Sequence, residues 1–216
     1  MKRILLTLVF LLMVSLFLQA QYQKNVGITN QHYHDLNIEL INDGTNDYVV
    51  AGNLFDAPVL NEELTLKRID QNGTIIWIQK YNITGLTHGR AFDVASEADT
   101  LFVTGSVDVN NVKKVFIAKI LATNGSLLAA SYYDILGPNF NSRGLHITHT
   151  RADATGNGMQ DQGVVVAGFF SDCFNVNINC SNNFGFVLRT DHNLNQLWLV
   201  EIDSAIPPPG TEDYDM

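Results

Sequence analysis

Several features that would identify an enzyme or a nucleic-acid-binding protein are missing from this sequence. It contains no Gly-x-Ser-x-Gly, no His-Glu-x-x-His and no phosphate-binding loop. Basic residues are few, with 13 Lys and Arg against 22 Asp and Glu and a formal net charge of −9. Such a surface repels nucleic acid and anionic lipid. We therefore expect no nucleic-acid partner, and the sequence singles out no catalytic or cofactor-binding residue.

Cysteine is also scarce, because Cys173 and Cys180 are the only two in 216 residues. In an exported chain an even number of cysteines indicates a disulfide, which here would close a loop over residues 174–179. Two free thiols or half a metal site is the alternative. A metal site is the weaker interpretation, since no further cysteine and no nearby histidine could complete the ligand set.

Long apolar runs are confined to the N-terminus. Lys2 and Arg3 precede an apolar stretch over residues 4–18, and the small residue Ala20 follows it. This order is typical of a secretory signal peptide, residues 1–20, cleaved after Ala20. An uncleaved membrane anchor is the alternative, but the stretch is shorter than the roughly 20 residues that a spanning helix needs. We expect residues 21–216 to be secreted or displayed at the cell surface, with no membrane span after cleavage.

What the sequence does contain is an internal repeat of about sixty residues. Its landmark is a short β-branched or aromatic run that ends in glycine, at residues 48–52, 101–105 and 164–168. An alternating apolar and polar run precedes each landmark, which is the pattern of a half-buried strand. These preceding runs are residues 36–40, 92–94 and 145–147.

Two more strand-like runs follow each landmark and are joined by a polar turn. The first runs are residues 64–69, 115–120 and 184–189, and the second are residues 75–81, 127–132 and 196–201. The turns between them lie at residues 70–73, 122–125 and 191–194. Two of the turns contain Asn-Gly, a strong hairpin signal because both residues tolerate positive φ.

Four strands repeated three times predict an all-β fold, a β-propeller-like array of about three four-stranded antiparallel blades. The expected blades span about residues 32–84, 87–136 and 140–204, and a fourth begins at residues 211–216. A propeller usually has 4 to 8 blades, so we expect an incomplete ring and an N-terminal fragment of a longer protein. A sandwich with duplicated halves is the alternative, but it would not require the same strand order three times.

The first copy, from Tyr48-Val49-Val50-Ala51-Gly52 to the turn and strand over residues 70–81, resembles the β-propeller repeats of secreted proteins from Bacteroidota-type bacteria. This resemblance covers the chain from about Gln21 onward and implies a scaffold with no catalytic residues to transfer. The same Asp-Gly-Trp spacing is also similar to quinoprotein-type propellers. There the tryptophans, here Trp77 and Trp198, dock neighbouring blades.

One loop could bind calcium. Asp153, Asn157 and Asp161 place oxygen ligands at intervals in a glycine-rich segment, as calcium loops do. Thr155 replaces an acidic ligand and the expected later Glu is absent, so a long polar hairpin loop is the alternative.

The histidines do not form an obvious metal site. His146 and His149 are three apart, so on a strand they would point to opposite faces. We interpret them as single surface or edge histidines.

The sequence thus favours an exported, non-enzymatic repeat scaffold that binds an extracellular protein or glycan. The alternative is a propeller enzyme, a quinoprotein-like oxidoreductase or a hydrolase, whose site lies in blades beyond this sequence.

Overall fold

The structure, a computed structural model, describes residues 32–56, 61–83, 89–137, 140–150, 163–171 and 183–202. Within these ranges the chain consists of β-strands, turns and loops, without a helix. The strands form three antiparallel four-stranded sheets, and each sheet is made of four consecutive strands in chain order. The expected all-β, propeller-like array of three four-stranded units is therefore confirmed.

The strand bounds match the repeat pattern closely. Unit 1 comprises β1 (His32–Leu40), β2 (Tyr48–Asp56), β3 (Asn61–Ile69) and β4 (Ile75–Tyr81). Unit 2 comprises β5 (Gly89–Glu97), β6 (Thr100–Val109), β7 (Val112–Leu121) and β8 (Leu127–Tyr133). Unit 3 comprises β9 (Asn141–Thr150), β10 (Gly163–Ser171), β11 (Asn183–Asp191) and β12 (Gln196–Ile202).

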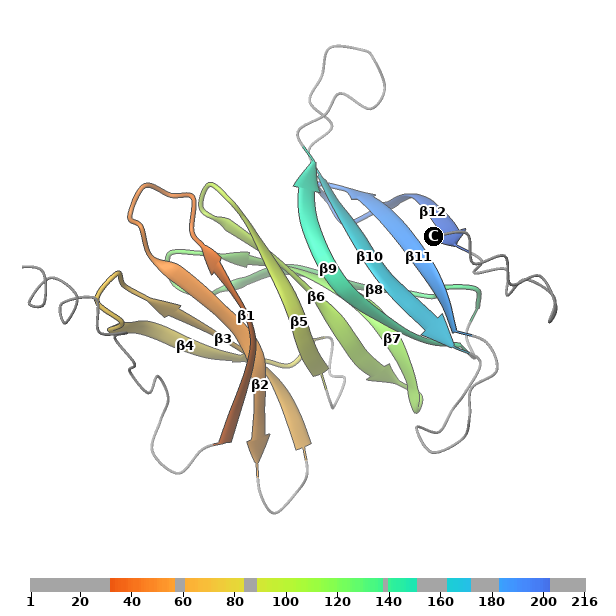
Figure 1. Cartoon of the computed structure of the whole chain (residues 1–216), viewed down its shortest axis with the longest axis horizontal. Helices are drawn as coiled ribbons and strands as arrows, with labels where there is room; N and C mark the ends of the chain where they lie inside the picture. The colour runs from red at the N-terminus through yellow and green to blue at the C-terminus, as the bar shows by residue number, and fades with distance from the viewer. Residues whose placement is uncertain are drawn as a thin grey trace, which may run out of the picture.

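The three units stack face to face, and their first strands β1, β5 and β9 lie side by side across the view of Figure 1. Strand β5 packs on β1, β2 and β3, and β9 packs on β5, β6 and β7. We call the face of a unit that is turned to the next unit its forward face, and the opposite one its rear face. One apolar cluster fills the space between units 1 and 2, and a second fills the space between units 2 and 3.

Each first strand carries a one-residue β-bulge at the same place, and this bulge explains the landmark glycines. The bulged residues are Leu36, Phe92 and Leu145. Opposite each bulge lies the glycine of the neighbouring second strand. A Cβ on Gly52 or Gly105 would overlap the carbonyl oxygen of the facing first strand. Glycine recurs here because the bulged backbone occupies the space of a side chain.

The hairpin turn between the third and fourth strands is also shared by the units. Asp70 accepts hydrogen bonds from the backbone N–H groups of Asn72 (2.8 Å) and Thr74 (2.7 Å), which lower the pKa of its carboxyl group. Gly73 follows at φ 75°. Of the Asn-Gly pair only Gly73 is found among the described residues with positive φ, and Asn72 is not. The predicted turn therefore ends in a left-handed glycine.

Tyrosine hydroxyl groups join units 1 and 2 to the turn of the unit that follows each of them. The hydroxyl of Tyr81 donates to the carbonyl of Gly125 (2.7 Å), and that of Tyr133 donates to the carbonyl of Leu194 (2.7 Å). Burial raises the pKa of both tyrosines well above the ordinary value, so both hydroxyl groups keep the proton that they donate. The two interfaces thus use the same contact.

A buried arginine links units 1 and 2. The Arg68 guanidinium donates to Asp47 (2.6 and 2.9 Å), to Asp43 (2.9 Å) and, across the interface, to the carbonyl of Ala122 (2.9 Å). Burial alone would raise the pKa of Asp43, but hydrogen bonds from Thr45 and the charge of Arg68 lower it overall. The Asp43 carboxylate therefore remains ionised beside the arginine.

Of the chain that the structure describes, no segment is a helix long and apolar enough to cross a membrane.

Candidate interaction site on the first strands

The candidate site is the surface formed by the first strands β1, β5 and β9, and its centre is Asp93 on β5. Its side chain is buried. One carboxylate oxygen accepts the backbone N–H of Ile147 on β9 (2.8 Å), and the other accepts the N–H of Val94 (2.9 Å). These two bonds fix the carboxylate between unit 2 and unit 3.

Asp93 also holds His146 of β9, whose Nδ1 lies 2.6 Å from the carboxylate. A carboxylate only accepts hydrogen bonds, so Nδ1 carries the proton, and a neutral imidazole then offers Nε2 as an acceptor. The His146 side chain is 74 % exposed, although its anchor is buried. The arrangement thus presents an oriented imidazole to solvent.

Glu39 of β1 adds a second carboxylate near this pair. Its pKa is raised, first by burial and then by the negative charge of Asp93, while the nearby His149 and His146 offset part of the rise. These electrostatic interactions connect side chains from all three units. The surface therefore carries side chains from all three units that can donate or accept hydrogen bonds.

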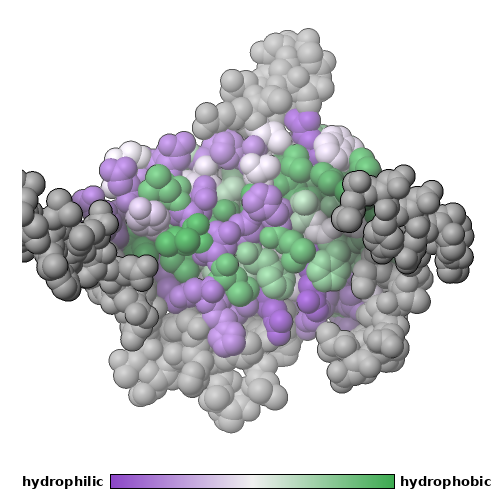
Figure 2. All heavy atoms as spheres, in the orientation of Figure 1, coloured by the Kyte–Doolittle hydropathy of each residue, from purple (hydrophilic) through white to green (hydrophobic). Residues whose placement is uncertain are grey.

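Apolar side chains stand beside these polar groups. The bulged residues Leu36 and Leu145 are half exposed, at 50 % and 47 %, and Phe92 is partly buried. Figure 2 shows hydrophobic surface gathered in the middle of this face, over the first strands and their neighbours. A β-bulge re-aims side chains in this way and is frequent next to functional sites.

The three copies of the repeat differ where they form this surface. The residue after the bulge is Asn37 in unit 1, Asp93 in unit 2 and His146 in unit 3. By contrast, the bulge and its facing glycine recur in all three units, and the turn capped by Asp recurs in units 1 and 3. The side chain at this position is therefore not dictated by the repeat itself.

The interpretation of the histidines as surface or edge residues was correct in part. His146 is exposed, as expected for a surface histidine, but the sequence did not reveal its contact with Asp93. Alignment of the repeats would have found it, since the two residues occupy the same position in neighbouring first strands. Among the residues that the structure describes, no group of three His, Cys, Asp or Glu side chains could hold a metal ion.

The tryptophans, expected to dock neighbouring units, differ in what they contact. Trp77 packs against the apolar cluster between units 1 and 2, and its indole N–H donates to the carbonyl of Ala122 (3.0 Å). Trp198, at the equivalent position of unit 3, is 40 % exposed.

Several sequence predictions lie outside the described residues. They are the calcium loop with Asp153, Asn157 and Asp161, the disulfide between Cys173 and Cys180, the signal peptide over residues 1–20 and the fourth unit from residue 211. They remain predictions.

Comparison with known proteins does not assign the chain to a family. No protein-family model matches the chain, and no curated protein shows significant similarity to it.

Proposed function

We propose that this protein is an exported, non-enzymatic scaffold that binds an extracellular protein or glycan through the first-strand surface. The observation that carries the proposal is the contrast between the copies. The residue after the bulge is the half-buried Asn37 in unit 1, the buried Asp93 in unit 2 and the exposed His146 in unit 3, which Asp93 orients. The mixture of exposed leucine with an oriented imidazole suits recognition, because apolar contact supplies affinity and placed polar groups supply specificity.

Binding is tested with the purified protein on a glycan array and on a panel of immobilised extracellular proteins, with calcium present and after its chelation. We expect a ligand whose binding is weakened at least about tenfold by Leu145→Ser and by His146→Ala. Leu128→Ser is the matched control, because Leu128 is equally exposed on β8 but lies outside the first strands. Absence of binding to either panel would contradict the proposal. An equal effect of Leu145→Ser and Leu128→Ser would contradict this choice of surface.

Export is tested separately. Mass spectrometry of the protein recovered outside the producing cells should show an N-terminus at Gln21, as the signal peptide predicts. Retention of residues 1–20 in the recovered protein would contradict cleavage after Ala20.

The Asp93–His146 pair favours one second candidate function, a hydrolase. A buried carboxylate that orients an exposed imidazole is the arrangement of a general base. Hydrolysis of ester, glycoside or phosphodiester reporters that is lost in His146→Gln and kept in His149→Gln would support this candidate. Equal rates for the wild type and His146→Gln would exclude this residue as the base.

A further inference from the structure

Beyond the bulge, the first strands present two hydrogen-bond acceptors from different units. Nε2 of His146 in unit 3 is an acceptor, because Nδ1 of the same ring carries the proton shared with Asp93. The carboxylate of Glu39, on the forward face of unit 1, is the other acceptor, and one of its bonds comes from the backbone N–H of Ser96 on β5. A ligand that satisfies both groups has to bring the donors.

Negative charge surrounds these acceptors. Burial is the larger cause that raises the pKa of Glu39, and the charge of Asp93 is the next. Glu39 takes part in none of the ion pairs found between described residues. A positive charge brought by a ligand would therefore offset a repulsion between carboxylates that the folded protein retains.

An unsatisfied side-chain oxygen adds to this negative field. Asn37 stands two residues before Glu39, on the same side of β1. Its Oδ1 is buried and meets no donor within the described part of the chain. The carbonyl dipole of this amide therefore stays uncompensated beside the carboxylates.

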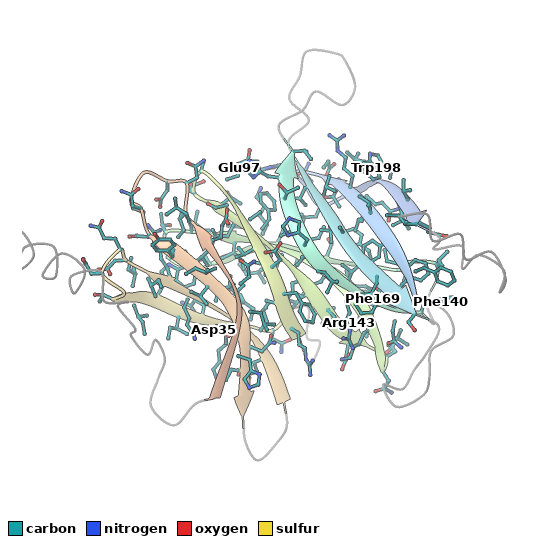
Figure 3. The ribbon with its side chains drawn as sticks, in the orientation of Figure 1. Asp35, Glu97, Phe140, Arg143, Phe169 and Trp198 are labelled. Atoms are coloured by element: carbon teal, nitrogen blue, oxygen red, sulfur yellow. The ribbon has the colours of Figure 1, made fainter. Side chains whose placement is uncertain are left out.

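The basic side chains of the first strands lie at the other end, before the bulge. They occupy one equivalent position in the three units, namely His34, Arg90 and Arg143. In Figure 3, Arg143 lies toward the lower end of β9, whereas Glu97 lies at the upper end of β5. Three residues of strand, about 10 Å, separate the basic position from the one after the bulge. The half of the surface after the bulge is thus the half that suits a cation.

Aliphatic side chains border the acceptors on both strands. Ile38 and Leu40, which flank Glu39 on β1, are 58 % and 49 % exposed. Leu145, which precedes His146 on β9, is half exposed as well. Exposed aliphatic groups that are scattered singly need no explanation, but several beside oriented polar groups are characteristic of an interaction surface. Apolar contact would therefore accompany the cation.

We propose that the ligand of the first-strand surface is a peptide segment of another protein in which lysine or arginine stands between aliphatic residues. This inference rests on the proposed function and names its class of partner. An ammonium group brings three donors and a guanidinium five, so either can serve the Glu39 carboxylate and Nε2 of His146 together. The aliphatic stem and its neighbours in the peptide then cover the exposed Ile38 and Leu145.

Other ligands fit this half of the surface less well. A neutral glycan brings hydroxyl donors but no charge, so the repulsion between Glu39 and Asp93 would remain. A ligand with a phosphate or carboxylate group would add a further negative charge. The formal net charge of −9 also favours the approach of a basic partner over that of an acidic one.

The test measures binding of the purified protein to synthetic peptides. The probes carry a central lysine or arginine flanked by leucine and valine, and the matched peptides carry methionine in place of the cation. We expect the basic peptides to bind at least about tenfold more tightly than the methionine peptides. The difference should shrink as the salt concentration rises, because salt screens exposed charges.

Glu39→Gln is the decisive variant, because it keeps the shape of the side chain and removes its charge. Since the pKa of Glu39 is raised, this change should not unfold the protein, and a thermal melt checks that it does not. We expect it to weaken binding of the basic peptides about tenfold and to leave binding of the methionine peptides unchanged. Glu201→Gln is the matched control, since it removes the same charge from an exposed position on β12, outside the first strands.

Equal affinities for the basic and the methionine peptides would overturn this inference, and so would equal effects of Glu39→Gln and Glu201→Gln. A glycan or an uncharged peptide that binds in a manner sensitive to Leu145→Ser would overturn the basic partner but leave the first-strand surface as the binding site. Absence of binding to the peptides, the glycan array and the protein panel would overturn the proposed function as well.

Discussion

The indole ring of Trp77 occupies the space that a side chain on Gly125 would need. A Cβ on Gly125 would lie 3.0 Å from Cε3 of the indole and 2.6 Å from Cγ of Gln79. The glycine also adopts φ 74°, a conformation that side chains disfavour. Gly125 therefore serves both the turn of unit 2 and the docking of unit 1.

Gly125→Ala should destabilise the protein by about 2–4 kcal/mol, the sum of overpacking and left-handed strain. Urea denaturation followed by tryptophan fluorescence measures the change. Gly44→Ala is the control, because Gly44 has φ 85° but nothing within 4 Å of a Cβ. It should cost only the strain, about 1–2 kcal/mol. If the two variants lost the same free energy of unfolding, the close approach of Trp77 to Gly125 would not contribute to the destabilisation.

Arg68→Met should lower the free energy of unfolding by about 3–5 kcal/mol, because it leaves the buried carboxylate of Asp47 without its cation. The control is Lys80→Met. Lys80 forms an ion pair with Glu63 (2.9 Å) in which both side chains are more than 40 % exposed, and it should contribute less than about 1 kcal/mol. If the two variants were equally stable, the buried network around Arg68 would not stabilise the interface.

Tyr81→Phe and Tyr133→Phe should each cost about 1 kcal/mol, since each removes one hydrogen bond to a carbonyl of the next unit. The two hydroxyl groups act at different interfaces, so the losses should add in the double variant. Chemical denaturation of the single and double variants checks both statements. Strong coupling between the two changes would indicate that the interfaces are not independent.

Glu39→Gln should stabilise the protein at neutral pH. The folded-state pKa of Glu39 lies above 4.5, so its ionised form is disfavoured in the folded protein. The contribution of this group to stability is therefore full below its unfolded pKa and is lost as pH rises through the folded pKa. Glutamine has no charge and avoids that loss.

Denaturation midpoints measured across pH test whether Glu39→Gln stabilises the protein as the pH rises. The wild type and Glu39→Gln should converge when the pH falls below about 4.5 and diverge above it. A constant difference at all pH values, or a less stable glutamine variant at neutral pH, would contradict the raised pKa.

Much of the fold could be predicted because its signals are local. Alternating apolar residues, turn residues and the recurring glycine mark the strands within short windows, and all twelve observed strands overlap the predicted runs. The reason for the glycine was not visible, because the bulge that fills its side-chain space lies on a neighbouring strand. The candidate site was missed for the same reason, since Asp93 and His146 meet only when two units stack.

The amino-acid sequence by itself determined the all-β class, the repeat and the order of strands, because backbone propensity and side-chain alternation act over a few residues. Only the tertiary structure decided which residues pair across units. The contacts of Arg68 with Ala122, of Tyr133 with Leu194 and of Asp93 with His146 join residues more than 50 positions apart. They form because two sheets stack at a fixed register, and that register is set by how side chains of different size fill the space between the sheets.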